Sequence, residues 1–392
     1  MDYLVFEREL GSRLQFVPGL PILVLVGARR TGKTTLIRNW YARAEGHKAW
    51  LDGDNPADLL AWERFLGGQD PASWLGSLLG LDAKGCGILV LDEAQGFSQV
   101  SRLVKVLVDA LPGLRVVMSG SSALKLKDFS AESMAGRKQL LELYPLSLKE
   151  RLSPLTPSLR ASSAPGMLQE MLVWGGFPGA MALPPDWSRV SYLTEVLDST
   201  LYRDLLSETR SRDVAVLKRL LVYLARSVGS KLNTANLSAS LELNRATVSR
   251  YLHLLSEASV LLLLPGITGQ GILPKAQPKP YFLDNGLLSM LLADDRSFLM
   301  RRPEEQGLLL ENFFVAELHK SYHYQGDHLT QLGYLWDKRA EIDLVAYSRG
   351  AIQAAWEVKL SQTQGGSRHS RELLGSAPFR LVNLQNMPEF LL

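Results

Sequence analysis

Two groups of side chains in this sequence have the types and spacing needed for chemistry on phosphates. The first is the run Gly27-Ala-Arg-Arg-Thr-Gly-Lys-Thr-Thr35, which fits the pattern G-x-x-x-x-G-K-[ST]. In such a run the glycines let backbone N–H groups face phosphate oxygens, the lysine reaches the β- and γ-phosphates, and the next hydroxyl ligates Mg²⁺. We therefore predict a phosphate-binding loop in which Lys33 is catalytic and Thr34 holds the metal. The predicted nucleotide-binding residues are Gly27, Arg30, Thr31, Gly32, Lys33, Thr34, Thr35 and Ser121.

An acidic pair at the end of another apolar run completes this first group. Residues 87–91 are followed directly by Asp92 and Glu93. A phosphate-binding loop of this type needs a carboxylate for the metal shell, often with a second acid that activates water. We predict that Asp92 lies on the metal side and that Glu93 polarises the attacking water. Acid pairs also end ordinary edge strands, but the loop upstream favours the catalytic interpretation.

Two further polar positions are candidates for the same site. A third apolar run, residues 114–118, ends in Ser119-Gly-Ser-Ser, whose hydroxyls we expect beside the terminal phosphate. Arg137 follows a turn of small residues. It is either a catalytic arginine that acts on the nucleotide of a neighbouring subunit or an ordinary surface cation.

The second group lies near the other end of the chain and consists of Glu311, Asp343, Glu357 and Lys359. Glu311 interrupts an apolar helix, and the other three fall on two strands joined by a turn at Gly350. Residues two apart on a strand point to one side, so Glu357 and Lys359 share a pocket that Asp343 can join. Asp343 and Glu357 can hold Mg²⁺, and Lys359 can orient the water that the metal activates. Acid and lysine pairs also occur on edge strands as solubility devices.

Helical periodicity between these two groups predicts a reader of DNA or a packing module. Residues 213–257 contain three short helical patterns, and the apolar run 260–264 follows them. A turn at residues 242–244 separates the last two helices, as in a winged helix-turn-helix. The predicted DNA-binding residues on the last helix are Arg245, Thr247, Ser249 and Arg250. The alternative is a helical module that links the two chemical groups without touching DNA.

The elements that must position these groups indicate an α/β fold with several domains. Residues 20–26 read as a buried strand of a parallel sheet, followed at once by a helix. The Pro- and Ser-rich stretch 153–166 is expected to be a linker, and residues 167–206 a helical lid over the nucleotide. In that lid Arg203 either faces phosphate or pairs with Asp204.

Composition excludes several classes of protein. The chain has 392 residues, more than one core organises, with 46% apolar and 21% charged residues, so we expect a folded protein of several domains. Its apolar runs are shorter than the roughly 20 residues of a membrane span, and we expect a cytoplasmic protein with no membrane partner.

The net charge of +3 neither requires nor excludes nucleic acid as a partner. The single cysteine, Cys86, precludes an intramolecular disulfide. His319 and His323 form either a metal pair or a surface pair.

Five motifs along the chain resemble, in order, a prokaryotic group of AAA-type ATPases. They are G-A-R-R-T-G-K-T-T, L-D-E-A-Q, S-G-S-S, M-A-G-R with Tyr144-Pro-Leu-Ser147, and Trp174-Gly-Gly-Phe-Pro178. In that group the ATPase precedes a C-terminal half of unknown function. The resemblance implies binding of ATP and Mg²⁺, ATP hydrolysis and assembly into a homo-oligomer. The order of Glu311, Asp343, Glu357 and Lys359 resembles the core of the PD-(D/E)XK nucleases, which implies metal-dependent cutting or docking.

These observations predict four domains and two competing functions. The predicted domains are a P-loop AAA-type ATPase core at 1–152, a helical lid at 153–210, a winged helix at 211–268 and a nuclease-like α/β domain at 269–392. The first hypothesis is an ATPase that acts on DNA as a motor, clamp or strand-processing factor. The second is an ATP-gated switch whose C-terminal domains dock a partner protein and cut nothing.

Overall fold

The structure is a computed structural model that describes residues 6–79, 87–121, 134, 136–199, 214–268, 271–293, 297–337, 340–361 and 373–392. The chain divides into two compact units: one is Arg8–Leu143, and the other is Tyr144–Leu392 together with the residues before Arg8. Cys86, Arg203 and Asp204 lie outside the described residues. No helix in the described ranges combines the length and the apolar character that crossing a membrane requires.

The N-terminal unit is built on a five-stranded sheet in which every pairing is parallel. The strand order is β2-β3-β4-β1-β5, so β4 lies between β1 and β3. This order brings the carboxyl ends of three chemically important strands to one edge. The strands are β1 (Ile22–Val26), β2 (Lys48–Asp52), β3 (Gly87–Asp92), β4 (Leu114–Gly120) and β5 (Lys138–Glu142).

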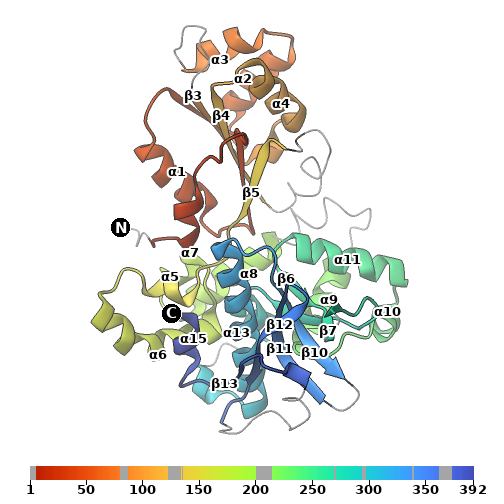
Figure 1. The fold of residues 1–392 in the computed structure, drawn as a ribbon. Helices are drawn as coiled ribbons and strands as arrows, with labels where there is room; N and C mark the ends of the chain where they lie inside the picture. Colours follow the sequence, from red (N-terminus) through yellow and green to blue (C-terminus); the bar gives the residue numbers. More distant parts are fainter. Residues whose placement is uncertain are drawn as a thin grey trace. The chain divides into compact units, whose positions relative to one another are not determined.

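Helices cover both faces of this sheet (Figure 1). On one face α2, α3 and α4 pack their apolar residues against alternate residues of β1, β3 and β4. Aromatic rings join α2 to α3: the ring of Phe65 stacks on that of Trp74 with 4.7 Å between ring centres, and Trp62 packs edge-on against both. Figure 1 shows α1 on the opposite side. The helical elements are η1 (Glu9–Arg13), α1 (Lys33–Arg43), α2 (Pro56–Leu66), α3 (Pro71–Leu79), η2 (Ala94–Gly96) and α4 (Val100–Ala110).

The C-terminal unit begins with helices, and one of them corrects the sequence interpretation. The predicted linker 153–166 is largely helical, because α6 spans Pro157–Trp174 with Pro165 inside it. Proline is acceptable at the first helical position, and buried Leu168, Met171 and Leu172 hold the later turns against the core. Tertiary packing therefore outweighs the local Pro and Ser signal. The other helices before the sheet are α5 (Leu148–Leu152), α7 (Pro178–Met181), α8 (Trp187–Ser199), α9 (Val214–Arg226), α10 (Thr234–Leu241) and α11 (Arg245–Glu257).

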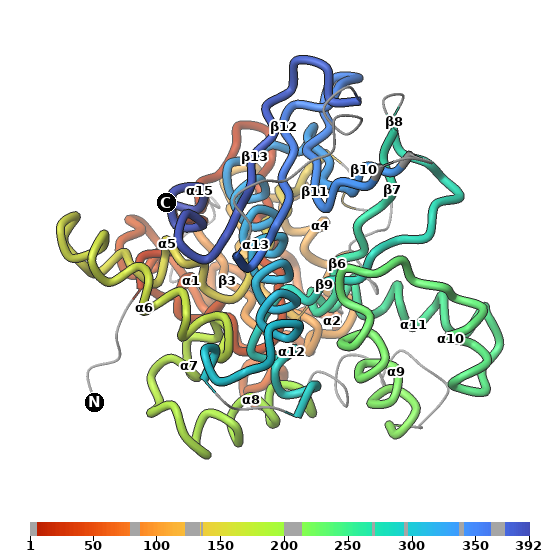
Figure 2. Tube along the Cα trace, turned by 90° about the horizontal axis from the view of Figure 1, so that it is seen from below, coloured from red at the N-terminus to blue at the C-terminus, as the bar shows by residue number. Residues whose placement is uncertain are grey.

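A mixed six-stranded sheet and a two-stranded sheet follow. The larger sheet has the order β13-β12-β11-β10-β7-β8, and the smaller one pairs β6 with β9 (Figure 2). The predicted wing strand is β6, but its partner β9 lies beyond the predicted winged-helix boundary at residue 268. The remaining elements are β6 (Leu261–Leu264), β7 (Gly266–Thr268), β8 (Gly271–Ile272), β9 (Lys279–Phe282), α12 (Asn285–Leu291), η7 (Phe298–Met300), α13 (Pro303–Gln325), β10 (Gln331–Asp337), β11 (Ala340–Ser348), β12 (Ala351–Val358), β13 (Phe379–Val382) and α15 (Met387–Leu391).

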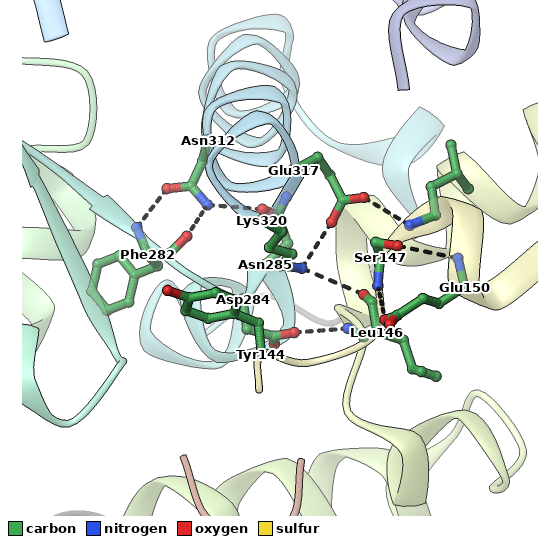
Figure 3. A network of polar contacts seen from close by, with 12 residues as sticks. Tyr144, Leu146, Ser147, Glu150, Phe282, Asp284, Asn285, Asn312, Glu317 and Lys320 are labelled. Carbon is green, nitrogen blue, oxygen red and sulfur yellow. Dashed lines mark hydrogen bonds and ion pairs between the residues drawn. The ribbon is translucent and has the colours of Figure 1, made fainter. Parts of the chain in front are cut away.

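Buried polar side chains hold α13, the helix that carries Glu311, in one position (Figure 3). The amide of Asn312 accepts from the N–H of Phe282 at 2.8 Å and donates to its carbonyl at 2.9 Å. Asn312 also donates to Asn285 at 2.8 Å, and Asn285 donates to the carbonyls of Leu172 and Leu309. Each of these buried amide groups is thus hydrogen-bonded, as burial requires.

One turn further along α13, a buried ion pair binds the first segment of this unit (Figure 3). Glu317 accepts from Lys320 at 2.8 Å and from the N–H of Leu148 at 2.7 Å, while Lys320 also donates to the carbonyl of Leu146. Both charged side chains are almost fully buried. The Tyr144-Pro-Leu-Ser147 motif therefore anchors the chain to α13.

Candidate functional sites

The predicted phosphate-binding loop connects β1 to α1 and has the backbone that such a loop needs. Gly27 has a φ of 152° and Gly32 a φ of 96°, both positive. A Cβ at Gly27 would lie 2.1 Å from the carbonyl oxygen of Leu143, so only glycine fits there. The ammonium of Lys33 is buried and donates to the carbonyls of Gly27 and Ala28, each at 2.9 Å. The loop is thus a compact turn with its lysine held at the centre.

The strand order brings Asp92 to the loop. The hydroxyl of Thr34 donates to Asp92 Oδ1 at 3.2 Å, and the hydroxyl of Ser119 also donates to that oxygen. Ser119 can do this because its strand, β4, lies between β1 and β3 and is therefore the direct neighbour of the strand that ends in Asp92. Sequence reasoning placed Ser119 near the phosphate but missed its contact with Asp92, which depends on the order of the strands.

Asp92 has the electrostatic environment of a cation ligand. Burial raises the pKa of Asp92; hydrogen bonds from Ser119 and Thr34 act in the opposite direction, and Glu93 and Asp52 raise it further. A divalent cation beside Asp92 would offset both the burial and the neighbouring acids. Thr34 and Asp92 therefore fit Mg²⁺.

Glu93 lies directly after the metal-side acid in a left-handed conformation, with a φ of 46°. Its N–H donates to Ser119 Oγ at 3.2 Å, and its carboxylate accepts from the amide of Gln95. Non-glycine residues adopt this backbone region at a cost and often at functional sites. The left-handed residue lies between β3 and the short helix η2, in which Gln95 holds the Glu93 carboxylate.

The remaining predicted residues of this site fall into two groups. Thr31 is fully buried and its hydroxyl donates to the carbonyl of Ala28 at 2.9 Å, whereas Arg30 and Thr35 are exposed. Ser121 is buried, and its hydroxyl has no hydrogen-bond partner in the described part of the chain. Such a hydroxyl can bond to a ligand.

Two arginines of this unit have partners that the sequence did not reveal. Arg137 pairs with Asp109 of α4 at 2.9 Å on the surface of the N-terminal unit. Arg8 donates to the carbonyl of Thr31 at 2.7 Å and so supports the loop from outside. No motif marks Arg8, because its role depends on how the segment before β1 folds back.

The second predicted group assembles in the C-terminal unit from α13, β11 and β12. Lys359 lies 3.2 Å from Glu357 and 3.8 Å from Asp343, and Asp343 also accepts from the N–H of Val358. Glu311 accepts from the hydroxyl of Tyr281 at 2.7 Å. Tyr281, on β9, is a contact that the sequence pattern missed.

The charges of this second group are mutually dependent. Burial raises the pKa of Glu311, and Asp343 raises it further. Burial also raises the pKa of Asp343, against the effect of Lys359. Burial lowers the pKa of Lys359, but Asp343 and Glu357 outweigh it and keep that pKa above its usual range. The four predicted residues therefore form one electrostatic group.

The donors present suit one kind of metal. Within the described ranges no three His, Cys, Asp or Glu side chains converge to form a metal cage. Mg²⁺ does not require one, since it is usually bound through one or two carboxylates and keeps several waters. Asp343 and Glu357 fit that pattern, whereas a structural zinc site would need more ligands. For the same reason nothing in the described part of the chain favours the metal-pair alternative for His319 and His323: His319 instead contacts the hydroxyl of Tyr144 at 3.2 Å.

The predicted DNA-reading helix is α11. Asn244 caps it by accepting from the N–H of Thr247 at 2.8 Å. Its apolar residues face the core, while Arg245, Ser249 and Arg250 are exposed and Thr247 is half-buried. The side chains proposed to read DNA thus lie mainly on the solvent side of the helix.

Comparison with known proteins places these sites in context. A family model for an AAA domain matches residues 20–152, and one for a domain of unknown function (DUF8612) matches residues 166–297. The uncharacterized protein Rv2008c of Mycobacterium tuberculosis is 28% identical over 378 residues, covering 95% of this chain and 78% of that protein. An uncharacterized protein of Haemophilus influenzae is 25% identical, covering 90% of this chain and 86% of that one. Among solved structures, the Walker-type ATPase PABY2304 of Pyrococcus abyssi is similar with a TM-score of 0.48 at 16% identity, over 74% of this chain and 96% of that one.

The chain therefore carries an AAA-type P-loop ATPase domain followed by a domain of unknown function. The parallel five-stranded sheet, the helical region and the mixed sheet confirm the α/β multidomain class.

Proposed function

We propose that this chain binds ATP with Mg²⁺ and hydrolyses it at the Lys33 loop. The observation that carries this proposal is the convergence of Thr34 and Ser119 on Asp92 at the edge of the sheet that the loop occupies. Mg²⁺ held by Thr34 and Asp92 would neutralise charge on the phosphates. Lys33 would bind the terminal phosphates, and Glu93 would orient and polarise the attacking water.

The Glu93→Gln variant tests this assignment. Loss of the carboxylate removes the group that polarises water, so hydrolysis should fall by about 10²- to 10⁴-fold. The affinity for ATP should stay close to that of the wild type, because the loop and Asp92 are intact. Phosphate release and binding of a fluorescent ATP analogue measure the two quantities. The matched control is Glu63→Gln, an exposed glutamate of the same unit; equal hydrolysis by both variants would contradict the role of Glu93.

A second activity is favoured by the assembly of Glu311, Asp343, Glu357 and Lys359 in one group. We propose that this group acts on the phosphodiester backbone of DNA, to which the exposed residues of α11 would also bind. In this scheme ATP turnover changes how the C-terminal unit engages the strand, in an oligomer where Arg137 serves a neighbouring nucleotide. The competing function is an ATP-gated switch that uses the same unit to dock a partner protein.

A DNA cleavage assay that compares the wild type with a Lys359→Ala variant distinguishes these two functions. We expect the wild type to cut single-stranded, duplex or branched DNA in Mg²⁺ or Mn²⁺, and the variant to cut about a hundredfold more slowly or not at all, as when one charge-stabilising group is removed. Gel analysis of labelled DNA gives the rates, with the exposed Lys275→Ala as the control. If the wild type cuts none of these substrates, the docking switch becomes the better assignment.

A further inference from the structure

The acidic group continues along one face of the sheet to an exposed tryptophan. Trp336 of β10 is the cross-strand partner of Glu341 on β11. Glu341 and Asp343 flank Ile342, which packs in the apolar cluster of the sheet, so both lie on the opposite face, next to the point where the register of β10 with β11 shifts between Gly333 and Leu335. On the other side, Lys359, which follows β12, lies 3.8 Å from Asp343 and 3.2 Å from Glu357 and so joins the two acids. One face of the sheet thus carries Trp336 next to the predicted phosphodiester site.

Two lysines meet the aromatic rings at this end of the face. The ammonium of Lys231 lies 4.9 Å from the ring centre of Trp336 and 5.5 Å from that of Tyr334, and Lys279 lies 5.1 Å from that of Tyr334. Glu341 bridges the lysines at 2.7 Å and 2.6 Å. We call Lys231, Lys279, Tyr334 and Trp336 the Trp336 shelf.

The shelf is a built site rather than a chance surface contact. Lys279 and Tyr334 are almost fully buried, and the hydroxyl of Tyr334 donates to the carbonyl of Gln277 at 2.7 Å. The loop that carries Lys231 is fixed to the segment before β9, because the N–H of Leu232 donates to the carbonyl of Pro278 at 2.8 Å. Trp336, by contrast, is 40% exposed. These fixed residues therefore support the ring of Trp336, which is accessible to a ligand.

The charge of the shelf suits a phosphate chain. Each carboxylate oxygen of Glu341 accepts from one of the two lysines, so two ammonium groups face one carboxylate. The excess positive charge lies at Lys231, the more exposed of the two lysines. An anion can approach there without displacing a buried group.

The spacing fits a nucleotide step. Two residues along a strand cover about 7 Å, and neighbouring strands lie about 5 Å apart. By these spacings Asp343 lies roughly 9 Å from Trp336, so the phosphate that adjoins a base on Trp336 can reach Asp343 and the group it belongs to. Duplex bases are already stacked on one another, so a ring of this kind selects an unpaired base.

We propose that Trp336 stacks against a base of single-stranded nucleic acid while Lys231 binds its phosphate, which positions the next phosphodiester at the acidic group. This inference rests on the proposed action of the C-terminal unit on nucleic acid. It is independent of ATP hydrolysis at the Lys33 loop. Trp336 and Lys231 are positioning residues, since neither touches the reacting atoms.

Binding of a fluorescein-labelled oligothymidylate, measured by anisotropy in Ca²⁺ buffer, tests the shelf. Loss of one base–aromatic stack should weaken binding by about tenfold in Trp336→Ala, and Trp336→Phe should retain most of the affinity. Lys231→Gln should lower the slope of log Kd against log salt by about one. The control is Trp187→Ala, which removes a tryptophan that is 78% exposed on α8.

An oligonucleotide that lacks its bases supplies the decisive comparison. The affinity of the wild type for this base-free strand should equal the affinity of Trp336→Ala for the complete strand. If Trp336→Ala and Trp187→Ala bind the complete strand equally well, the shelf is refuted while action on nucleic acid stands. If the wild type binds only duplex DNA, the shelf is likewise refuted. If the wild type binds no nucleic acid of any form, the proposed action on DNA fails as well, and ATP hydrolysis in the same preparation still reports on the Lys33 loop.

Discussion

Replacing Lys33 with alanine should reduce ATP hydrolysis by at least about a hundredfold, the scale of effect seen when a group that stabilises developing charge is removed. The ammonium of Lys33 is buried at the centre of the loop and already bonded to two of its carbonyls. Binding of ATP should weaken too, because the lysine contacts the phosphates before and during reaction.

The measurement is steady-state phosphate release with saturating ATP and Mg²⁺. Arg64→Ala removes an exposed cation from α2 of the same unit and serves as the control. Circular dichroism should show that both variants keep the sheet, since the bonds of Lys33 to Gly27 and Ala28 close a local turn rather than join distant elements. Hydrolysis by the Lys33 variant at the rate of the control would overturn the assignment of the loop.

Replacing Glu317 with alanine should destabilise the C-terminal unit by about 3–5 kcal/mol, as expected when one partner of a buried ion pair is removed. The deletion leaves the Lys320 ammonium and the N–H of Leu148 buried without the carboxylate that each contacts. The loss of stability comes mainly from these two buried groups, which have lost the carboxylate. The net contribution of the intact pair is much smaller, because burial of both charges is itself unfavourable.

Urea unfolding followed by near-ultraviolet circular dichroism measures this loss. Glu304→Ala, at the exposed start of the same helix, should cost less than about 1 kcal/mol, the usual size of a helix-terminus charge effect. The double variant Glu317→Leu with Lys320→Met should recover much of the stability, because no charge is left unpaired. A single Glu317 variant as stable as the Glu304 variant would show that the buried pair is not the origin of the stability.

The local parts of the ATPase site could be predicted from the sequence because adjacent residues define them. Lys33 and Thr34 follow their strand directly, and Asp92 and Glu93 end theirs. The hydrogen bond from Ser119 to Asp92 could not be predicted in this way, since it requires β4 to lie between β1 and β3. Strand order is a property of the whole sheet and has no local signal.

The C-terminal unit shows the same limit more strongly. The types and spacing of Asp343, Glu357 and Lys359 predicted that they come together, and Lys359 lies 3.8 Å from Asp343 and 3.2 Å from Glu357. Tyr281 could not be paired with Glu311, because β9 and α13 are separate elements whose packing the pattern does not encode. The helix over the Pro-rich stretch was missed because its stability comes from buried Leu168 and Met171, which both lie beyond the end of the predicted linker.

The amide of Asn312 also determines how accurately the acidic group is assembled. Because it bonds to both backbone groups of Phe282, β9 cannot shift along α13 by one residue without losing both hydrogen bonds. Tyr281 and Glu311 precede these two residues in their own elements, so they meet in a single alignment. A misaligned β9 would thus lose hydrogen bonds to the neutral amide of Asn312, which is not one of the reacting groups. Mutations within the charged group can therefore change its chemistry without changing its alignment.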